Sequence, residues 1–573
     1  MIQDRPPSPL TRATGEAKRI LGRVASFSFL INLLMLVSPL YMLQIYDRVL
    51  SSGSAPTLLY LTLFAAACLI TMAALELVRS RILVRLGGKL DALLSREVFA
   101  SVLTNGRTGQ SFRDLDNLRA FLTGAGMLAL LDAPWTPVYI ALVYLLHPML
   151  GHVALAGAII LFILGLMNER ATRAPLTKAG MEMAASTQFA ELSARNSDVV
   201  HAMGMLPGLQ SVWRKWHDSG IRLQAEASDR AGEIAATAKF VRIFLQVAIL
   251  GVGAYLVIGQ EVTAGVMIAA SIIMGRGLAP VESAIGAWRG FLQAREGYGR
   301  IKEELEKNVQ GADPMPLPAP SGALMLENVT GGPPGGQKPV INNISAKLKS
   351  GVSMGITGPS AAGKSSLARL IVGVWKPISG MVRLDGVNLS TWRREEVGPH
   401  IGYLPQNVEL LAGTVAQNIS RFEHDADPEA IVKAAKTAGV HDLIVKLPEG
   451  YETAVGEQGS ALSAGQAQRI ALARALYREP FLVVLDEPNS NLDYEGDEAL
   501  ARAVMSVRKR GGIAVVVAHR PSALEAVDLL CVMGQGRMQH PVGPKDAVLA
   551  KVLQRPAQPR PLKVVPETGE APA

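Results

Sequence analysis

Cysteine is nearly absent from this chain, which has two cysteines among its 573 residues. Cys68 lies inside an apolar run, and Cys531 lies in a late run that is typical of a strand. Two thiols placed in this way exclude a disulfide framework and a cysteine-based metal site.

A cleavage site is also lacking, because no small-residue pattern follows the first apolar run. Residues 1–23 carry Pro6, Pro7 and Pro9 together with basic side chains. We therefore expect a cytoplasmic lead-in to a retained membrane helix, and not a cleaved signal peptide.

Acidic residues are outnumbered by basic ones, 49 against 57, which gives a net charge of +8. A basic chain can bind nucleic acid, but much of this excess lies between and beside apolar runs. The positive-inside rule explains such a distribution without a nucleic-acid partner. We expect a protein of the lipid bilayer that binds no nucleic acid.

Six apolar stretches in the first half approach the length that crosses a bilayer. Residues 79–126 and 169–239 are basic next to these stretches, which places them and both termini in the cytoplasm. Their helical patterns predict membrane helices that continue well beyond the bilayer; soluble helical domains inserted between the spans are the alternative. The six stretches are 24–45, 57–78, 127–146, 152–167, 240–258 and 263–280.

Asp132 and Arg276 are ionisable residues inside the apolar stretches. Asp132 begins the segment Asp-Ala-Pro-Trp-Thr-Pro, and Arg276 lies in the sixth stretch. A charge there is costly, so both predict side chains that face the helix bundle or a polar path. The alternatives are that Asp132 marks the cytoplasmic end of its span, with Trp135 as an interface anchor, and that Arg276 reaches the inner interface.

The second half has the composition of a soluble α/β domain. Residues 308–322 carry four prolines, Pro314, Pro316, Pro318 and Pro320, and predict a semi-rigid linker. We expect the first strands at 324–329 and 351–357 and a helical insert at 427–447. The predicted organisation is a lead-in at 1–23, a six-helix membrane domain at 24–307, the linker at 308–322, an α/β domain at 323–552 and a disordered tail at 553–573.

One loop of the α/β half matches the pattern G-x-x-x-x-G-K-[ST] between a strand-like and a helix-like run. Its glycines allow backbone N–H groups to close around phosphates, while Lys364 reaches the β- and γ-phosphates and Ser365 offers a hydroxyl to Mg²⁺. An ordinary glycine-rich turn is the alternative for the pattern alone. The predicted ATP-binding residues are Gly358, Pro359, Ser360, Ala361, Ala362, Gly363, Lys364, Ser365 and Ser366.

Two carboxylates, Asp486 and Glu487, end the apolar run 481–487. This arrangement holds Mg²⁺ through Asp486 and polarises an attacking water through Glu487. A core strand that ends in a surface acid pair is the alternative. Between the loop and these acids lies Leu-Ser-Ala-Gly-Gln at 462–466, followed by a helical run at 467–474.

The order of these motifs, with Gln406, the run 490–493 and His519, resembles the ATPase domain of ABC transporters. The resemblance gives Gln406 and His519 catalytic roles beside Glu487. It also adds Gln406 to the metal ligands Ser365 and Asp486. It further implies ATP contacts from the ABC signature, which is the segment 462–466, and from the D-loop, which is the run 490–493. The residues are Ser463, Gly465, Gln466 and Asp493.

The membrane half extends the resemblance to half-size ABC exporters, and within them to the PrtD-type transporters of bacterial type I secretion. The matching segments are 113–122, 132–137, 196–207, 271–280 and 486–493. The resemblance implies an exporter-type six-helix domain fused to a cytoplasmic P-loop ATPase. It also implies a multi-pass homodimer in the inner membrane, a periplasmic membrane-fusion adaptor, an outer-membrane channel, and an unfolded protein cargo with an uncleaved C-terminal signal.

Two positions depart from the family pattern. The signature has Ala464 where the family usually has a second glycine, so we expect a slower or weaker site. The segment 330–337 lacks the aromatic residue that usually stacks on adenine, which predicts loose discrimination of the base.

Three functions compete at this stage. They are ATP-driven protein export, export of a lipid or drug-like molecule by the same ATPase domain, and a role in which nucleotide only gates a complex. The presence of Lys364, both acids and His519 disfavours the third function. The membrane half favours protein cargo. Neither cysteine lies in the N-terminal segment 1–23, where a cysteine peptidase that removes a leader from the cargo would need one. We therefore expect that the transporter does not process its cargo.

Overall fold

The computed structural model describes residues 9–105, 110–308, 317–336, 338–456, 459, 461–490 and 494–553. The chain divides into two compact units, Met1–Gln310 and Gly311–Ala573. Most of the predicted tail, part of the linker and Asp493 lie outside the described residues.

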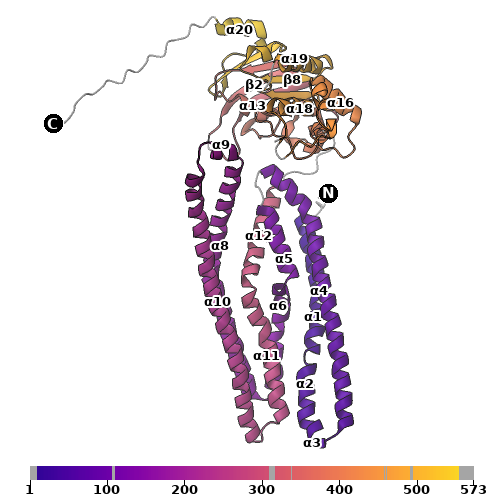
Figure 1. The fold of residues 1–573 in the computed structure, drawn as a ribbon, viewed down its shortest axis with the longest axis vertical. Coiled ribbons are helices and arrows are strands. Elements are labelled where there is room, and N and C mark those ends of the chain that lie inside the picture. Colours follow the sequence, from indigo (N-terminus) through magenta and orange to yellow (C-terminus); the bar gives the residue numbers. More distant parts are fainter. Residues whose placement is uncertain are drawn as a thin grey trace, which may run out of the picture. The chain divides into compact units, whose positions relative to one another are not determined.

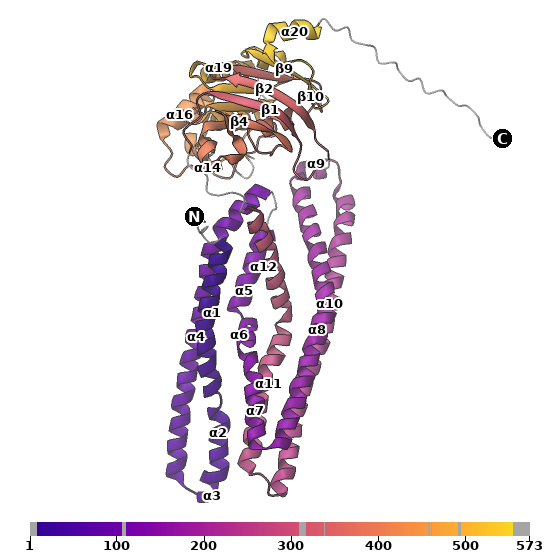
Figure 2. The same cartoon turned by 180° about the vertical axis from the view of Figure 1, so that it is seen from behind.

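The first unit consists of helices (Figures 1 and 2). Within the described residues, six helical segments are long and apolar enough to cross a membrane, in agreement with the six predicted stretches. The elements are α1 (Pro9–Leu34), α2 (Val37–Gln44), the π-helix η1 (Ile45–Val49), α3 (Leu50–Ser52), α4 (Ala55–Asn105), α5 (Gln110–Thr123), α6 (Ala125–Asp132), the 3₁₀ turn η2 (Ala133–Trp135), α7 (Thr136–Leu146), α8 (Pro148–Ala194), α9 (Ser197–Ala202), α10 (Leu206–Ile258), α11 (Ala264–Gly286) and α12 (Trp288–Asn308).

The membrane helices continue far beyond a bilayer. Helix α4 has 51 residues, which is about 75 Å at the rise of an α-helix, against about 30 Å for a hydrocarbon core. Helices α8 and α10 are similarly long, with 47 and 53 residues, and lie side by side in both views (Figures 1 and 2). The prediction of extended helices is confirmed, and the described residues contain no separate soluble domain between these spans.

Asp132 faces the helix bundle. It ends α6, and its Oδ1 lies 3.0 Å from Nη1 of Arg79 on α4 and accepts a hydrogen bond of 3.0 Å from Asn32 on α1. The side chains of Arg79 and Asp132 are 7% and 14% exposed. Arg79 is one of the basic residues that the sequence places in the cytoplasm, and it is a buried partner of Asp132. Arg276 is exposed on α11, and whether either residue lines a transport path stays a prediction.

The second unit is an α/β unit with two sheets (Figure 2). The larger sheet has the order β10-β9-β3-β8-β7-β6, with β3, β6, β7 and β8 paired in parallel, and β11 beside β9. The smaller, antiparallel sheet has the order β2-β1-β4-β5. The strands are β1 (Ala323–Gly331), β2 (Ile341–Lys349), β3 (Ser353–Thr357), β4 (Ser379–Leu384), β5 (Val387–Asn388), β6 (Ile401–Leu404), β7 (Leu482–Asp486), β8 (Ile513–Val517), β9 (Leu529–Gly534), β10 (Arg537–Met538) and β11 (Gly543–Pro544).

Strand β2 corrects the expectation that the first two strands are 324–329 and 351–357. It lies between them and was missed because its exposed positions are polar, including Asn343, Ser345 and Lys347. An antiparallel strand with one solvated face lacks the continuous apolar run that marks a buried parallel strand. The parallel strands β7 and β8, buried at every position, show that run.

Short helices cover this unit. They are α13 (Lys364–Ile371), η3 (Leu389–Thr391), α14 (Arg394–Val397), η4 (Gly398–His400), α15 (Val415–Ile419), α16 (Pro428–Thr437), α17 (His441–Val445), η5 (Gly450–Glu452), α18 (Ala464–Leu476), α19 (Tyr494–Lys509), η7 (Pro521–Leu524) and α20 (Lys545–Leu553). Helices α16 and α17 lie in the predicted insert at 427–447.

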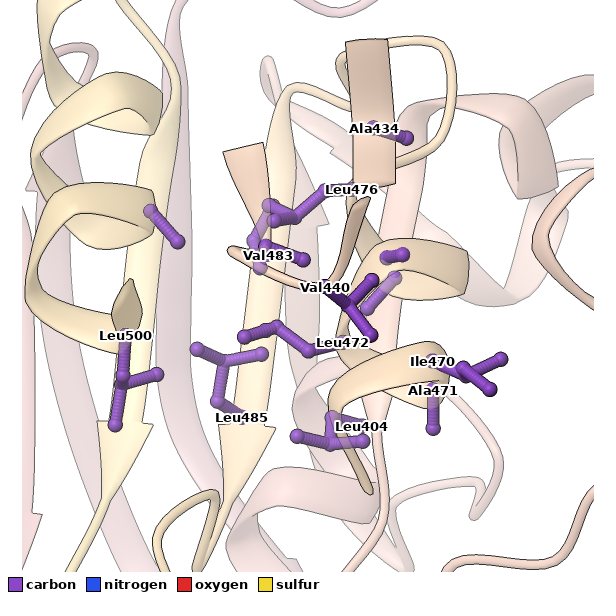
Figure 3. Close-up of a cluster of buried hydrophobic side chains, with 14 of the residues drawn as sticks. Leu404, Ala434, Val440, Ile470, Ala471, Leu472, Leu476, Val483, Leu485 and Leu500 are labelled. Atoms are coloured by element: carbon purple, nitrogen blue, oxygen red, sulfur yellow. The ribbon is translucent and has the colours of Figure 1, made fainter. Parts of the chain in front are cut away.

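One apolar face of helix α18 lies in the same buried core as strand β7. Leu472 and Leu476, four residues apart, belong to the same buried cluster as Val483 and Leu485 of β7 (Figure 3). Residues at this spacing lie on one side of a helix. The second half of α18 and strand β7 therefore share one core.

Candidate functional site

The loop between β3 and α13 has a backbone conformation that depends on its two glycines, Gly358 and Gly363. Gly358 and Gly363 have φ values of 148° and 94°. A Cβ atom on Gly358 would lie 2.2 Å from the carbonyl oxygen of Met533 on β9. The carbonyl of Ala362 accepts a hydrogen bond of 3.1 Å from the N–H of Gly536. Glycine is thus needed for the backbone conformation and, at Gly358, for the close approach of β9.

Lys364 opens α13 and folds back over this loop. It is 5% exposed, and its Nζ donates hydrogen bonds of 3.1 and 2.9 Å to the carbonyl oxygens of Gly358 and Pro359. Burial lowers the pKa of the Lys364 ammonium, and the negative charges of Glu487 and Asp486 oppose that shift. The loop therefore contains a positive charge at the N-terminal end of a helix, a combination that suits phosphate.

Asp486 ends β7 and is 1% exposed. Its Oδ1 accepts a hydrogen bond of 3.1 Å from Ser365 Oγ, and its buried Oδ2 has no hydrogen-bond partner within the described residues. Burial raises the pKa of this carboxyl, the Ser365 hydroxyl opposes the shift, and the charge of Glu487 adds to it. A hydroxyl beside a buried, half-satisfied carboxylate is an oxygen set that fits Mg²⁺.

Glu487 lies one residue further and is held by two partners. Its Oε2 accepts a hydrogen bond of 3.0 Å from Gln406 Nε2, and its Oε1 lies 3.3 Å from Nε2 of His519. Gln406 follows β6 and His519 follows β8, so both come from strands beside β7.

The topology explains why these distant residues meet. Strands β3, β8, β7 and β6 are neighbours in one parallel sheet, and each carries part of the cluster just after its carboxyl end. Carboxyl ends of parallel strands share one edge, which is where open α/β sheets bind ligands. The residues that the structure brings together are Lys364, Ser365, Gln406, Asp486, Glu487 and His519.

The signature residues form a different arrangement. Ser463 caps α18: its hydroxyl accepts from the N–H of Gln466 at 3.3 Å, and the Gln466 side chain accepts from the N–H of Ser463 at 2.9 Å. Ala464 begins the helix and is exposed, as Ser463 is, while Gly465 is half-buried. No hydrogen bond within the described residues joins Ser463 or Gln466 to the loop 358–366.

Comparisons with known proteins agree with this geometry. The model of the ABC transporter family matches residues 341–490, and that of the ABC transporter transmembrane region matches residues 23–277. The type I secretion system ATP-binding protein PrsD of Rhizobium meliloti (strain 1021) is 48% identical over 95% of this chain and 95% of that protein. The chain belongs to the ABC transporters of type I secretion.

More distant relatives and a solved structure extend the match. The cyclolysin secretion/processing ATP-binding protein CyaB of Bordetella pertussis and the leukotoxin translocation ATP-binding protein LktB of Mannheimia glucosida are each 28% identical over 91% of this transporter and 75% of their own length. A bacterial Atm1-family ABC exporter with ATP bound has a TM-score of 0.81 at 20% identity, covering 93% of this chain and 96% of that one, which supports the fold. The transporter is therefore an inner-membrane protein with a cytoplasmic ATPase domain, and it couples ATP hydrolysis to transport.

One site residue of this ABC transporter was missed from the sequence. Gln468 of α18 is 2% exposed, and its Nε2 donates to the carbonyl oxygens of Glu487, at 3.3 Å, and of Pro488. The available signal was the second glutamine two residues after Gln466. Because that spacing turns a side chain to the opposite face of a helix, Gln468 points into the domain.

Proposed function

We propose that this transporter exports an unfolded protein cargo by hydrolysing ATP at two composite sites of a homodimer. The observation that carries the proposal is the 48% identity to a type I secretion ATP-binding protein over 95% of both chains. Support from chemistry comes from the cluster at the edge of the parallel sheet.

Within that cluster we assign the phosphates of ATP to the loop 358–366. Lys364 neutralises charge on the β- and γ-phosphates, and the backbone N–H groups of the loop donate to phosphate oxygens. Ser463, Gly465, Gln466 and Asp493 are assigned to ATP by family resemblance. Asp493 lies outside the described residues.

Ser365 and Asp486 would hold Mg²⁺, with Gln406 as a further oxygen donor. When bound, the ion supplies positive charge that stabilises the phosphoryl group during transfer. Oδ2 of Asp486 has no hydrogen-bond partner in the described part of the chain, and this supports the assignment, because an unpaired buried carboxylate oxygen is costly in the absence of a cation.

Glu487 is the proposed general base. It orients the attacking water and accepts its proton, while His519 and Gln406 hold the carboxylate from two sides. Full activity in Glu487→Gln would remove Glu487 from this role. Loss of hydrolysis with retained ATP binding is the expected result, whereas Lys364→Ala should weaken binding itself.

We propose that two chains form the sites, and the separate partners of the loop and the signature within one chain support this. Ser463 bonds Gln466 at the start of α18, whereas the loop bonds β9 and Asp486. We propose that the signature of each subunit caps the γ-phosphate held by the other. The first proposed partner of the transporter is therefore a second copy of the same chain.

The remaining proposed partners are a periplasmic membrane-fusion adaptor, an outer-membrane channel, and a cargo with a C-terminal signal that stays on the product. Coexpression with an adaptor and a channel from the source organism, followed by mass spectrometry of the medium, tests them. We expect secretion of a candidate cargo to require its C-terminal segment and Glu487. Secretion of the truncated cargo, or of cargo by Glu487→Gln, would reject the proposal, and ATPase stimulation by lipid would favour the small-molecule alternative.

A further inference from the structure

Gln468 connects the signature helix to the turn that carries Glu487. Its Nε2 donates to the carbonyl oxygens of Glu487 and Pro488 and lies 3.3 Å from Ser490 Oγ. Its Oε1 accepts from the same hydroxyl at 3.4 Å. One buried carboxamide therefore contacts three of the four residues in the turn 487–490.

Glu487 needs such support because its backbone is strained. Its φ is 49°, in the left-handed region that costs an L-residue energy. On one side, the N–H of Glu487 donates to the carbonyl oxygen of Val517 on β8 at 2.9 Å. On the other side, its carbonyl oxygen is held by Gln468. A residue kept in a costly conformation stays there only when its surroundings fix it.

The position of Gln468 along α18 gives the contact a second consequence. Ser463 caps the same helix five residues earlier, and Leu472 and Leu476 place the second half of the helix in the same buried core as β7. A short α-helix moves as a rigid body, so a displacement of its start is transmitted to the carboxamide of Gln468.

We propose that Gln468 is a positioning residue for ATP hydrolysis. It holds the turn 487–490 so that the Glu487 carboxylate points at the attacking water, and it makes that orientation depend on the position of α18. The inference rests on the proposed role of Glu487 as general base. Gln468 itself does not contact the nucleotide in this scheme.

The test uses the full-length transporter and the variant Gln468→Met, which keeps side-chain length and removes every donor. We expect kcat for ATP to fall roughly 10- to 100-fold, because a small misplacement of a reacting group costs that much. The KM for ATP should stay within about twofold, because the phosphate loop and Lys364 are unchanged.

Asn418 provides a matched control in the same domain. It is 0% exposed, and its Nδ2 donates to the carbonyl oxygens of Leu411 and Thr414 at 2.8 and 3.0 Å. Asn418→Leu therefore also removes a buried carboxamide that satisfies backbone carbonyls, at a turn without a site residue. We expect it to lower the melting temperature as Gln468→Met does and to retain kcat.

Each outcome decides the inference. Wild-type kcat in Gln468→Met, or an equal loss of kcat in Asn418→Leu, would overturn it. If Gln468→Met does not fold, Ser490→Ala removes one partner of the carboxamide, and an unchanged kcat there would overturn it as well. Glu487→Gln is measured in parallel: if that variant is active, the proposed general base fails; if it is inactive while Gln468→Met is normal, only the present inference fails.

Discussion

Replacing Asp132 by alanine removes the acidic partner of a buried arginine. Both carboxylate oxygens of Asp132 accept from Nη1 of Arg79, at 3.0 and 3.2 Å. The remaining polar contact of that guanidinium within the described residues is with Ser28 Oγ at 3.0 Å. Asn32 would lose one acceptor at the same time and keep its hydrogen bond of 2.8 Å to the carbonyl oxygen of Ser28. The variant Asp132→Ala therefore leaves a buried guanidinium without its acidic partner where helices α1, α4 and α6 meet.

The size of the effect follows from the burial. With Arg79 at 7% exposure, breaking the pair should destabilise the membrane unit by about 3–5 kcal/mol, the range for a buried ion pair that loses one member. The melting temperature of the full-length protein in detergent should fall on the order of 10 °C. Ser51→Ala, a change at an exposed hydroxyl on α3, serves as the control that should change neither quantity.

The double variant Arg79→Met with Asp132→Leu separates burial from transport. Apolar replacements of similar volume remove both desolvated charges together, so we expect the double variant to recover most of the lost stability. Full stability in Asp132→Ala, or no recovery in the double variant, would refute the reasoning. If the double variant is stable and still exports cargo, the ion pair only stabilises the helix bundle. If it is stable but does not export, the charges take part in transport.

Three further predictions concern the ATPase unit. Mixing Lys364→Ala chains with Ser463→Arg chains should restore one composite site per heterodimer, whereas each variant alone should be inactive in an ATPase assay; activity of an isolated monomer would contradict the composite site. Asp486→Asn should raise the melting temperature of nucleotide-free protein at neutral pH, because burial raises the pKa of Asp486 and its charged form is disfavoured in the fold. That gain should vanish as the pH falls below the ordinary aspartate pKa of about 4, where Asp486 is protonated in both states; a gain that persists there would contradict the electrostatic cause. Ala464→Gly should raise ATP turnover a fewfold by allowing closer backbone approach, at a cost of up to about 1 kcal/mol in α18; unchanged turnover would show that the methyl group does not limit the site.

The sequence was sufficient for features that short patterns dictate. The loop 358–366 was predictable because its conformation depends on its own glycines and on the strand and helix beside it. Buried parallel strands such as β7 were equally clear, since every residue of Leu482–Asp486 is buried. The six membrane spans followed from apolar length alone.

Contacts between distant residues were not predictable in the same way. Asp132 was recognised as costly, but its partner Arg79 is 53 residues away, and the basic stretch around it gave a simpler explanation. Gln468 was overlooked because the resemblance assigns only Ser463, Gly465 and Gln466 of this segment to ATP, and the inward face of α18 has no pattern of its own. In both cases the three-dimensional packing selects one residue from several of the same type.

The two kinds of charged cluster in this protein show where the fold is optimised for stability and where it is not. Asp114 is 1% exposed, yet both its oxygens accept from Arg300, at 2.8 and 2.7 Å, and this pairing raises the pKa of the arginine. Asp486 is equally buried, but among the residues that the structure describes one of its oxygens has no hydrogen-bond partner, and its neighbour Glu487 has a left-handed backbone. A chain that pairs one buried aspartate fully has no general need to leave another half-paired. The cost is concentrated where phosphate, a metal ion and water are proposed to bind, which is the pattern expected when a site is shaped by its reaction and not by the stability of the empty domain.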